Sequence, residues 1–119
     1  MITKLAPNEV FVFGSNLAGR HGAGAARQAF KQFGAVMGVG EGLRGQSYAF
    51  PTLDRKLWQL PISRMEESRD QLYSVCADFP NKQFLLTKVG CGLAGHPEAI
   101  MRGLFTDHPA NLILPEDWL

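Results

Sequence analysis

The sequence predicts an α/β domain in which a mainly parallel sheet lies between two layers of helices. Short apolar segments alternate with segments of helical periodicity, in the order strand, helix, strand, helix, strand, helix, strand. Two of the apolar segments end in glycine-rich loops. The 119 residues, 45% hydrophobic and 19% charged, suffice for one domain with a real core. We therefore expect residues 1–119 to form a single three-layer α/β/α sandwich.

The first half of the chain is predicted to contain two strands and one helix. Residues 9–13 are β-branched and aromatic and stop at Gly14, as a buried strand does. Residues 24–33 place apolar side chains on one helical face and precede Gly34, a common helix stop. After a loop with room for a short strand at 35–37, residues 46–52 are predicted to form the second main strand.

The second half is predicted to contain two helices and two strands. An irregular connection leads to a helix over residues 61–79, which has a proline in its first turn and an apolar stripe. Residues 83–90 are apolar enough for a central strand. A short helix over 97–105 and a strand over 111–115 follow, and Trp118 is expected to pack the carboxyl-terminal tail.

Composition and charge narrow the function classes. The formal net charge of +1 indicates no strong field toward nucleic acids or membranes. Two cysteines form no disulfide framework, which favours the cytoplasm. The amino-terminal segment is too short and polar for a signal peptide, and no apolar run approaches the roughly 18 residues of a membrane span. Histidines and cysteines lack metal-ligand spacing, so we expect neither metal nor cofactor, and the oligomeric state stays open.

The glycines gather in two places. Of the 13 glycines, nine lie in residues 14–45 and three in residues 90–95. Each loop follows a predicted strand and precedes a helix, so both should lie at the sheet edge where α/β proteins bind ligands. Unpaired N–H groups and the dipole at a helix start attract phosphate. Tight turns and close helix–sheet packing also use glycine, and the spacing matches neither the dinucleotide fingerprint nor a Walker A loop.

The stretches GSNLAGRHGAGAARQAFKQFG (14–34) and TKVGCGLAG (87–95) together resemble the macrodomain family of ADP-ribose-binding modules. The likeness is greatest to the branch that includes ADP-ribosyl-glutamate glycohydrolases, and it extends to short bacterial and phage proteins. It implies a macrodomain-like fold that binds ADP-ribose or a related nucleotide diphosphate, free or attached to protein or nucleic acid. The 22–26 loop would hold a phosphate and the distal ribose, the 90–95 loop would cover the diphosphate, and Asn16 would face the ribose hydroxyls.

The chain departs from the family pattern at three places. Residues 1–8 contain no Asp of the kind that reads adenine in many macrodomains, so the base is not specified. Leu53 and Ala94 replace the Lys and Asp of the glycohydrolase branch, and neither can act as nucleophile, acid or base. Residues 54–56, Asp-Arg-Lys, lie nearby as substitutes. Two alternatives to simple binding stay open: an ADP-ribosyl glycohydrolase, and a phage or bacterial interaction protein with a vestigial cleft.

Several candidate residues have a second interpretation. Asn16 either binds ligand or hydrogen-bonds its own turn. His21 and His96 either contact phosphate or ribose or are exposed loop histidines. Cys91 is better explained as a small residue between glycines than as the nucleophile of a Cys–His pair. Trp58 is a candidate stacking platform. The predicted ligand-binding residues are Gly14, Ser15, Asn16, His21, Gly22, Ala23, Gly24, Ala25, Gly90, Cys91, Gly92, Leu93, Ala94, Gly95 and His96.

Overall fold

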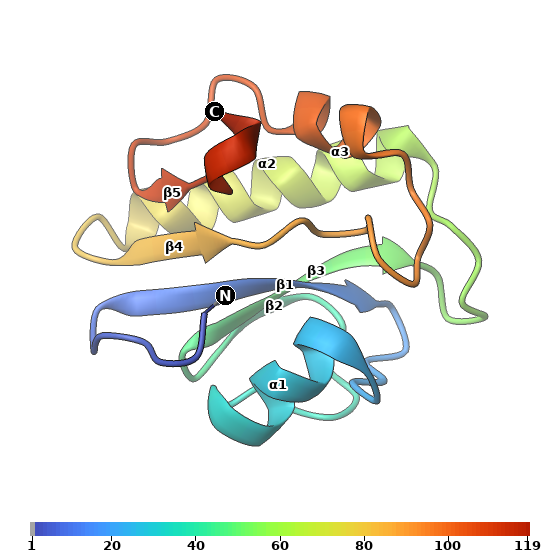
Figure 1. Ribbon diagram of the computed structural model, residues 1–119, viewed down its shortest axis with the longest axis horizontal. Coiled ribbons are helices and arrows are strands. Elements are labelled where there is room, and N and C mark those ends of the chain that lie inside the picture. The colour runs from blue at the N-terminus through green and yellow to red at the C-terminus, as the bar shows by residue number, and fades with distance from the viewer. Residues whose placement is uncertain (1) are drawn as a thin grey trace.

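The computed structural model describes residues 2–119 and contains a mixed five-stranded sheet with three α-helices (Figure 1). The elements in chain order are β1 (Glu9–Asn16), α1 (Gly24–Gln32), β2 (Gly42–Arg44), β3 (Ser47–Leu53), α2 (Ile62–Asp78), β4 (Gln83–Leu86), α3 (Glu98–Leu104), β5 (Leu112–Ile113) and a short 3-10 turn η1 (Glu116–Trp118). The predicted α/β class and all three helices are confirmed, with helix ends that differ by at most one residue.

Strand β1 lies at the centre of the sheet, whose order is β2-β3-β1-β4-β5. It pairs in parallel with β3 on one side and β4 on the other, and β4 pairs in parallel with β5. The edge strand β2 runs antiparallel to β3 after a two-residue connection. The open option of a strand at 35–37 is therefore wrong, because the short additional strand is β2.

Alternate side chains of β1 point to opposite faces of the sheet, as in any strand. Phe11 and Phe13 pack with the apolar side of α1, whereas Val10 and Val12 pack with side chains of α2 and α3. Helix α1 thus covers one face, and α2 with α3 covers the other (Figure 1). Trp118 is buried in the second of these cores, which confirms its predicted packing role.

The bounds of several strands differ from the prediction. The second main strand covers 47–53 rather than 46–52, and the last covers 112–113 rather than 111–115. The two differences that shape the site are the ends of β1 and β4. β1 continues past Gly14 to Asn16, because it pairs with β3 as far as Leu53. β4 ends at Leu86 rather than at residue 90, since its pairing with β1 stops at Val12. Residues 87–90 consequently belong to the loop. Among residues 2–119, no helix combines the length and apolar character needed to cross a membrane.

Candidate ligand-binding cleft

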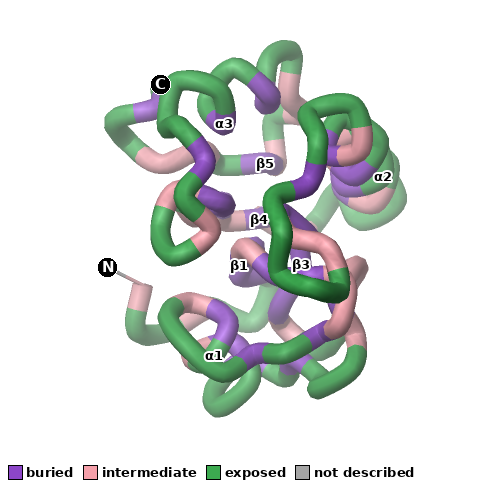
Figure 2. The backbone as a smooth tube through the Cα atoms, turned by 90° about the vertical axis from the view of Figure 1, so that its right-hand side faces the viewer, coloured by how far each residue is buried: buried purple, intermediate pink, exposed green. Residues whose placement is uncertain are grey.

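Both glycine-rich loops lie at the carboxyl ends of parallel strands and border one cleft of about 890 Å³. Figure 2 looks onto the carboxyl ends of these strands, toward which the β1, β3 and β4 arrows point in Figure 1. Twelve of the predicted residues line the cleft, namely Gly14, Ser15, Asn16, Gly22, Ala23, Gly24, Ala25, Gly90, Cys91, Gly92, Leu93 and Ala94. The other three, His21, Gly95 and His96, lie outside its lining.

The Asn16 side chain holds the turn that begins the first loop. Its Nδ2 donates to the carbonyl of Arg20 at 3.0 Å, and its Oδ1 accepts the Arg20 N–H at 3.0 Å. These bonds are the local turn contacts that asparagine favours. The amide keeps one N–H and one acceptor position for other partners. Asn16 therefore stabilises the turn through both amide atoms and also lines the cleft.

His21 anchors the first loop from behind. It is almost fully buried, and its Nε2 lies 3.0 Å from the carbonyl oxygen of Val36 and 3.1 Å from that of Val39. Because carbonyl oxygens only accept, Nε2 carries the ring proton. The imidazole also packs edge-on against Phe13, with 5.2 Å between ring centroids. His21 is neither exposed nor directed into the cleft lining.

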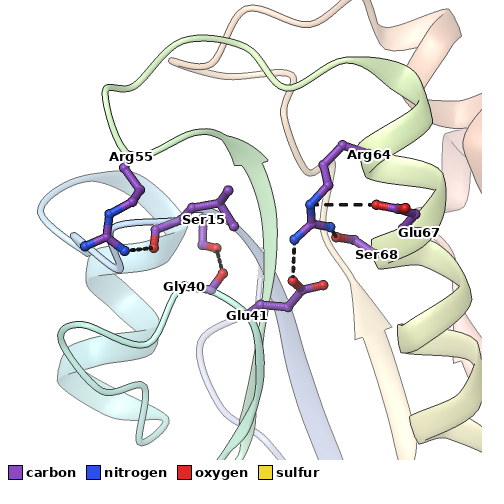
Figure 3. Close-up of polar contacts among 8 residues, drawn as sticks. Ser15, Gly40, Glu41, Arg55, Arg64, Glu67 and Ser68 are labelled. Carbon is purple, nitrogen blue, oxygen red and sulfur yellow. Dashed lines mark hydrogen bonds and ion pairs between the residues drawn. The ribbon is translucent and has the colours of Figure 1, made fainter.

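Ser15 and Gly40 hold a further segment against the end of β1. The Ser15 hydroxyl donates to the carbonyl of Gly40, so this oxygen is already engaged within the fold (Figure 3). A Cβ at Gly40 would overlap the backbone of Asn16. Nearby, Arg64 of α2 pairs at 2.9 Å with Glu41, which directly precedes β2, and this ion pair joins the helix to that segment (Figure 3). The contact of Arg64 with Glu67 at 3.9 Å lies within α2.

The start of α1 presents unpaired backbone N–H groups at the cleft. Residues 22–26 all line it, and the capping residue Ala23 has no side chain that could accept a hydrogen bond. The first helical bond of this end is donated by Arg27, and the first turn holds no acidic residue. Orphan N–H groups together with the helix dipole give this wall partial positive charge.

The second loop is packed tightly against the end of β3. Gly90 has a φ of +77°, and a Cβ there would lie 3.2 Å from atoms of His96, Met101 and Thr52. His96 is buried, and its ring Nε2 lies 2.8 Å from the Thr52 carbonyl oxygen. The backbone N–H of His96 donates to the Gly90 carbonyl. His96 is therefore a structural residue of the loop, and Gly90 fits only because it has no side chain.

Gly22 and Gly92 differ from the glycines that the fold requires. A Cβ at either position would meet no atom within 4 Å, and neither residue has the left-handed φ that favours glycine. Gly14, by contrast, lies where the loops meet, and a Cβ there would be 3.1 Å from the Gly90 nitrogen. Backbone geometry therefore explains Gly14 and Gly90 but not Gly22 and Gly92, which leave open space on the cleft surface.

Three charged side chains line the cleft. Arg20 forms no ion pair within residues 2–119, and Arg27, Lys31 and Arg44, which are near the first loop in sequence, lie outside the lining. Within the same lining, Lys88 pairs with Glu98 at 3.0 Å. Sequence reasoning did not select Thr52, Leu57, Thr87, Lys88, Val89 or Glu98 as site residues. Four of these, Leu57, Thr87, Lys88 and Val89, follow the ends of β3 and β4, so the strand-end rule applied to every strand would have found them.

The cleft lining contains no activated nucleophile. Burial and nearby Glu98 raise the pKa of the Cys91 thiol, which keeps it protonated at neutral pH. Its Sγ lies 3.5 Å from the Val89 carbonyl, and no hydrogen bond joins it to a histidine within residues 2–119. These observations favour the small-residue interpretation of Cys91. The same part of the chain holds no group of three or more potential metal ligands.

The side chains near the replaced catalytic positions are engaged elsewhere. Leu53 and Ala94 both line the cleft. Asp54 accepts the N–H groups of Lys56 and Trp58 within its own turn. None of residues 54–56 belongs to the lining, so the expected substitutes for the missing Lys and Asp lie away from it. Trp58 is 71% exposed but also lies outside the lining.

Comparisons of the chain with protein-family models, curated proteins and solved structures gave no match.

Proposed function

We propose that the protein binds ADP-ribose, or a related nucleotide diphosphate, in the cleft between residues 14–26 and 90–96. The observation that carries this proposal is the pair of glycines Gly22 and Gly92, one on each loop. Both line the cleft, both have open space where a side chain would be, and neither needs glycine for its backbone conformation. A ligand that approaches the backbone closely supplies a reason for glycine at both positions.

The charge of the cleft supports an anionic ligand. The uncapped start of α1, with its unpaired N–H groups, suits a phosphate. Arg20 adds a cationic side chain that forms no ion pair within residues 2–119, and Lys88 adds a second one that is paired with Glu98 and Asp117. A cleft of about 890 Å³ lies within the range of small-molecule sites. The choice of ADP-ribose among diphosphates rests on the resemblance of the two loops to those of macrodomains. On the same basis we propose that the helix-covered sheet is a macrodomain-like three-layer sandwich.

We favour recognition over cleavage of the ligand. Leu53 and Ala94 stand where the glycohydrolase branch has its Lys and Asp. Glu98 is the only carboxylate of the lining, and hydrogen bonds from Trp118 and Lys88 lower its pKa, which makes it a weak base. The free thiols of Cys76 and Cys91 suit a reducing cytoplasm, where we place the protein.

Calorimetric titration with ADP-ribose, ADP and ribose 5-phosphate tests the proposal. We expect ADP-ribose to bind more tightly than either half, because both loops then contact one ligand. Absence of binding by all three compounds would overturn the proposal and leave the interaction protein with a vestigial cleft as the better explanation.

Variants of Gly22 and Gly92 test whether the ligand binds between the two loops. Gly22→Glu and Gly92→Glu should each weaken ADP-ribose binding by about tenfold or more, or ~1.4 kcal/mol, because a carboxylate would occupy the phosphate region. Gly103→Glu is the matched control, since Gly103 also has open space but lines a separate pocket of about 520 Å³ beside α3. Circular dichroism verifies the fold of each variant. Unchanged binding by both cleft variants would show that the cleft is misassigned.

A further inference from the structure

The last turn of the chain reaches a charged group of the cleft. Lys88 lines the cleft, and its Nζ lies 2.5 Å from Oδ2 of Asp117 and 3.0 Å from Oε1 of Glu98. Glu98 begins α3 and also lines the cleft, whereas Asp117 belongs to η1 near the carboxyl terminus. One ammonium group is thus shared between the cleft wall and the carboxyl-terminal turn.

The Glu98 carboxylate has more hydrogen-bond partners than the Asp117 carboxylate. Oε1 of Glu98 also accepts the indole N–H of Trp118 at 2.9 Å, and the Trp118 ring is buried in the core. Within residues 2–119, Lys88 is the one side-chain partner of the Asp117 carboxylate. The Asp117 side chain is 65% exposed. Exposed ion pairs contribute little free energy. Asp117 is therefore the partner that Lys88 can exchange at low cost.

This arrangement affects any anion that enters the cleft. Two carboxylates around one ammonium leave a net negative charge beside Lys88, which opposes an anionic ligand. Lys88 could donate to phosphate oxygens charge-assisted hydrogen bonds of the same kind as the one it donates to the Asp117 carboxylate. A phosphate and the Asp117 carboxylate are thus alternative partners for the same Nζ.

We propose that Lys88 binds a phosphate of the ligand and that Asp117 competes with the ligand for Lys88. The carboxyl-terminal turn therefore weakens anion binding in the cleft, and ligand binding releases Asp117 from it. This inference rests on the proposed function for the position of the ligand, but the competition concerns phosphate groups in general.

Charge-neutral variants test the competition by calorimetric titration at low ionic strength, with ADP-ribose and with inorganic pyrophosphate as probes. Asp117→Asn should tighten binding roughly two- to fivefold, the range set by exposed ion pairs. Glu116→Gln is the matched control, because Glu116 lies in the same turn and forms no ion pair within residues 2–119. Lys88→Gln should weaken binding, and Asp117→Asn should have no further effect in that background.

The outcomes distinguish a failure of the proposed competition between Asp117 and phosphate from a failure of the proposed ligand. An equal effect of Asp117→Asn and Glu116→Gln, or an Asp117→Asn effect that persists with Lys88→Gln, would overturn the competition while leaving the proposed function intact. The expected pattern with pyrophosphate but no binding of ADP-ribose would retain the competition and refute the ligand. Failure of both probes to bind any variant would refute both. Circular dichroism should show native spectra throughout, since Lys88, Glu116 and Asp117 are exposed.

Discussion

The two glycine-rich loops border one cleft but are held in place by different means. Side chains hold the first loop: the Asn16 amide bonds to the backbone of Arg20, and His21 bonds to the carbonyls of Val36 and Val39. The second loop is held by packing of Gly90 against α3 and β3, by the bond between His96 and Thr52, and by Gln59, whose Nε2 donates to the Ala94 carbonyl at 2.8 Å. Each loop nevertheless has an open glycine on its cleft side.

The difference indicates unequal contributions to ligand binding. The first loop leads directly into α1, whose nine residues begin with unpaired N–H groups at the cleft. The second loop leads through Pro97 into the seven-residue α3. We infer that the first loop supplies most of the electrostatic attraction for phosphate, whereas the second supplies a fixed wall that closes the cleft.

The largest effect is expected where glycine is required by packing. A Cβ at Gly19 would overlap the backbone of Gly38, and φ is +70°. Gly19→Ala should lower the free energy of unfolding by about 3 kcal/mol or more, from backbone strain and overpacking together. The matched control Gly92→Ala should change it by less than about 0.5 kcal/mol. Urea denaturation measures both, and similar losses would remove the distinction between packed and open glycines.

A smaller effect is expected from the histidine of the second loop. The buried Thr52 carbonyl has two hydrogen-bond partners, the His96 ring and the Leu60 N–H. His96→Leu removes the first of them and should destabilise the protein by about 0.5–1.5 kcal/mol. His108→Leu serves as the control, because His108 bonds only to the adjacent Pro109 carbonyl and is half-buried. Urea denaturation of the two variants side by side gives the comparison. A destabilisation by His108→Leu as large as that by His96→Leu would contradict the anchoring role of His96.

The smallest effect concerns reaction rates of the two cysteines rather than stability. Cys91 lines the cleft, whereas Cys76 is fully buried with its pKa raised to about 11 by burial. Iodoacetamide at pH 8 should alkylate Cys91 first, faster as pH rises because the thiolate reacts, and Cys76 only after unfolding. Saturating ADP-ribose should slow the reaction of Cys91. Mass spectrometry of the alkylated peptides measures both rates, and equal reactivity would contradict these positions.

Much of the site was predictable because it depends on strand direction. Parallel strands place their carboxyl ends at one edge, so the two loops were expected together, and both Gly22 and Gly92 were identified. Lys88 was missed as a site residue because the predicted strand extended over residues 83–90 and therefore placed Lys88 within the strand rather than in the loop. The strand ends earlier only because its pairing with β1 stops at Val12, which is a tertiary fact.

Three further misses concern residues 21–44. Residues 35–37 have a sequence compatible with a strand, but the carbonyl of Val36 bonds to buried His21 instead. Strand β2 has three residues and no apolar alternation, so its pairing with β3 gives no local signal. The burial of His21 was likewise hidden, because a histidine beside glycine in a polar loop gives no sign of a buried partner.

Backbone NMR of the glycine amides tests the central claim most directly. Addition of ADP-ribose to the ¹⁵N-labelled protein should shift the signals of Gly22, Gly24 and Gly92, which line the cleft, and leave those of Gly45 and Gly103 unchanged. We expect the shifts to concentrate in the two loops at the carboxyl ends of the parallel strands. Unchanged signals of Gly22 and Gly92 at saturating ADP-ribose, or shifts centred on Gly103, would contradict it.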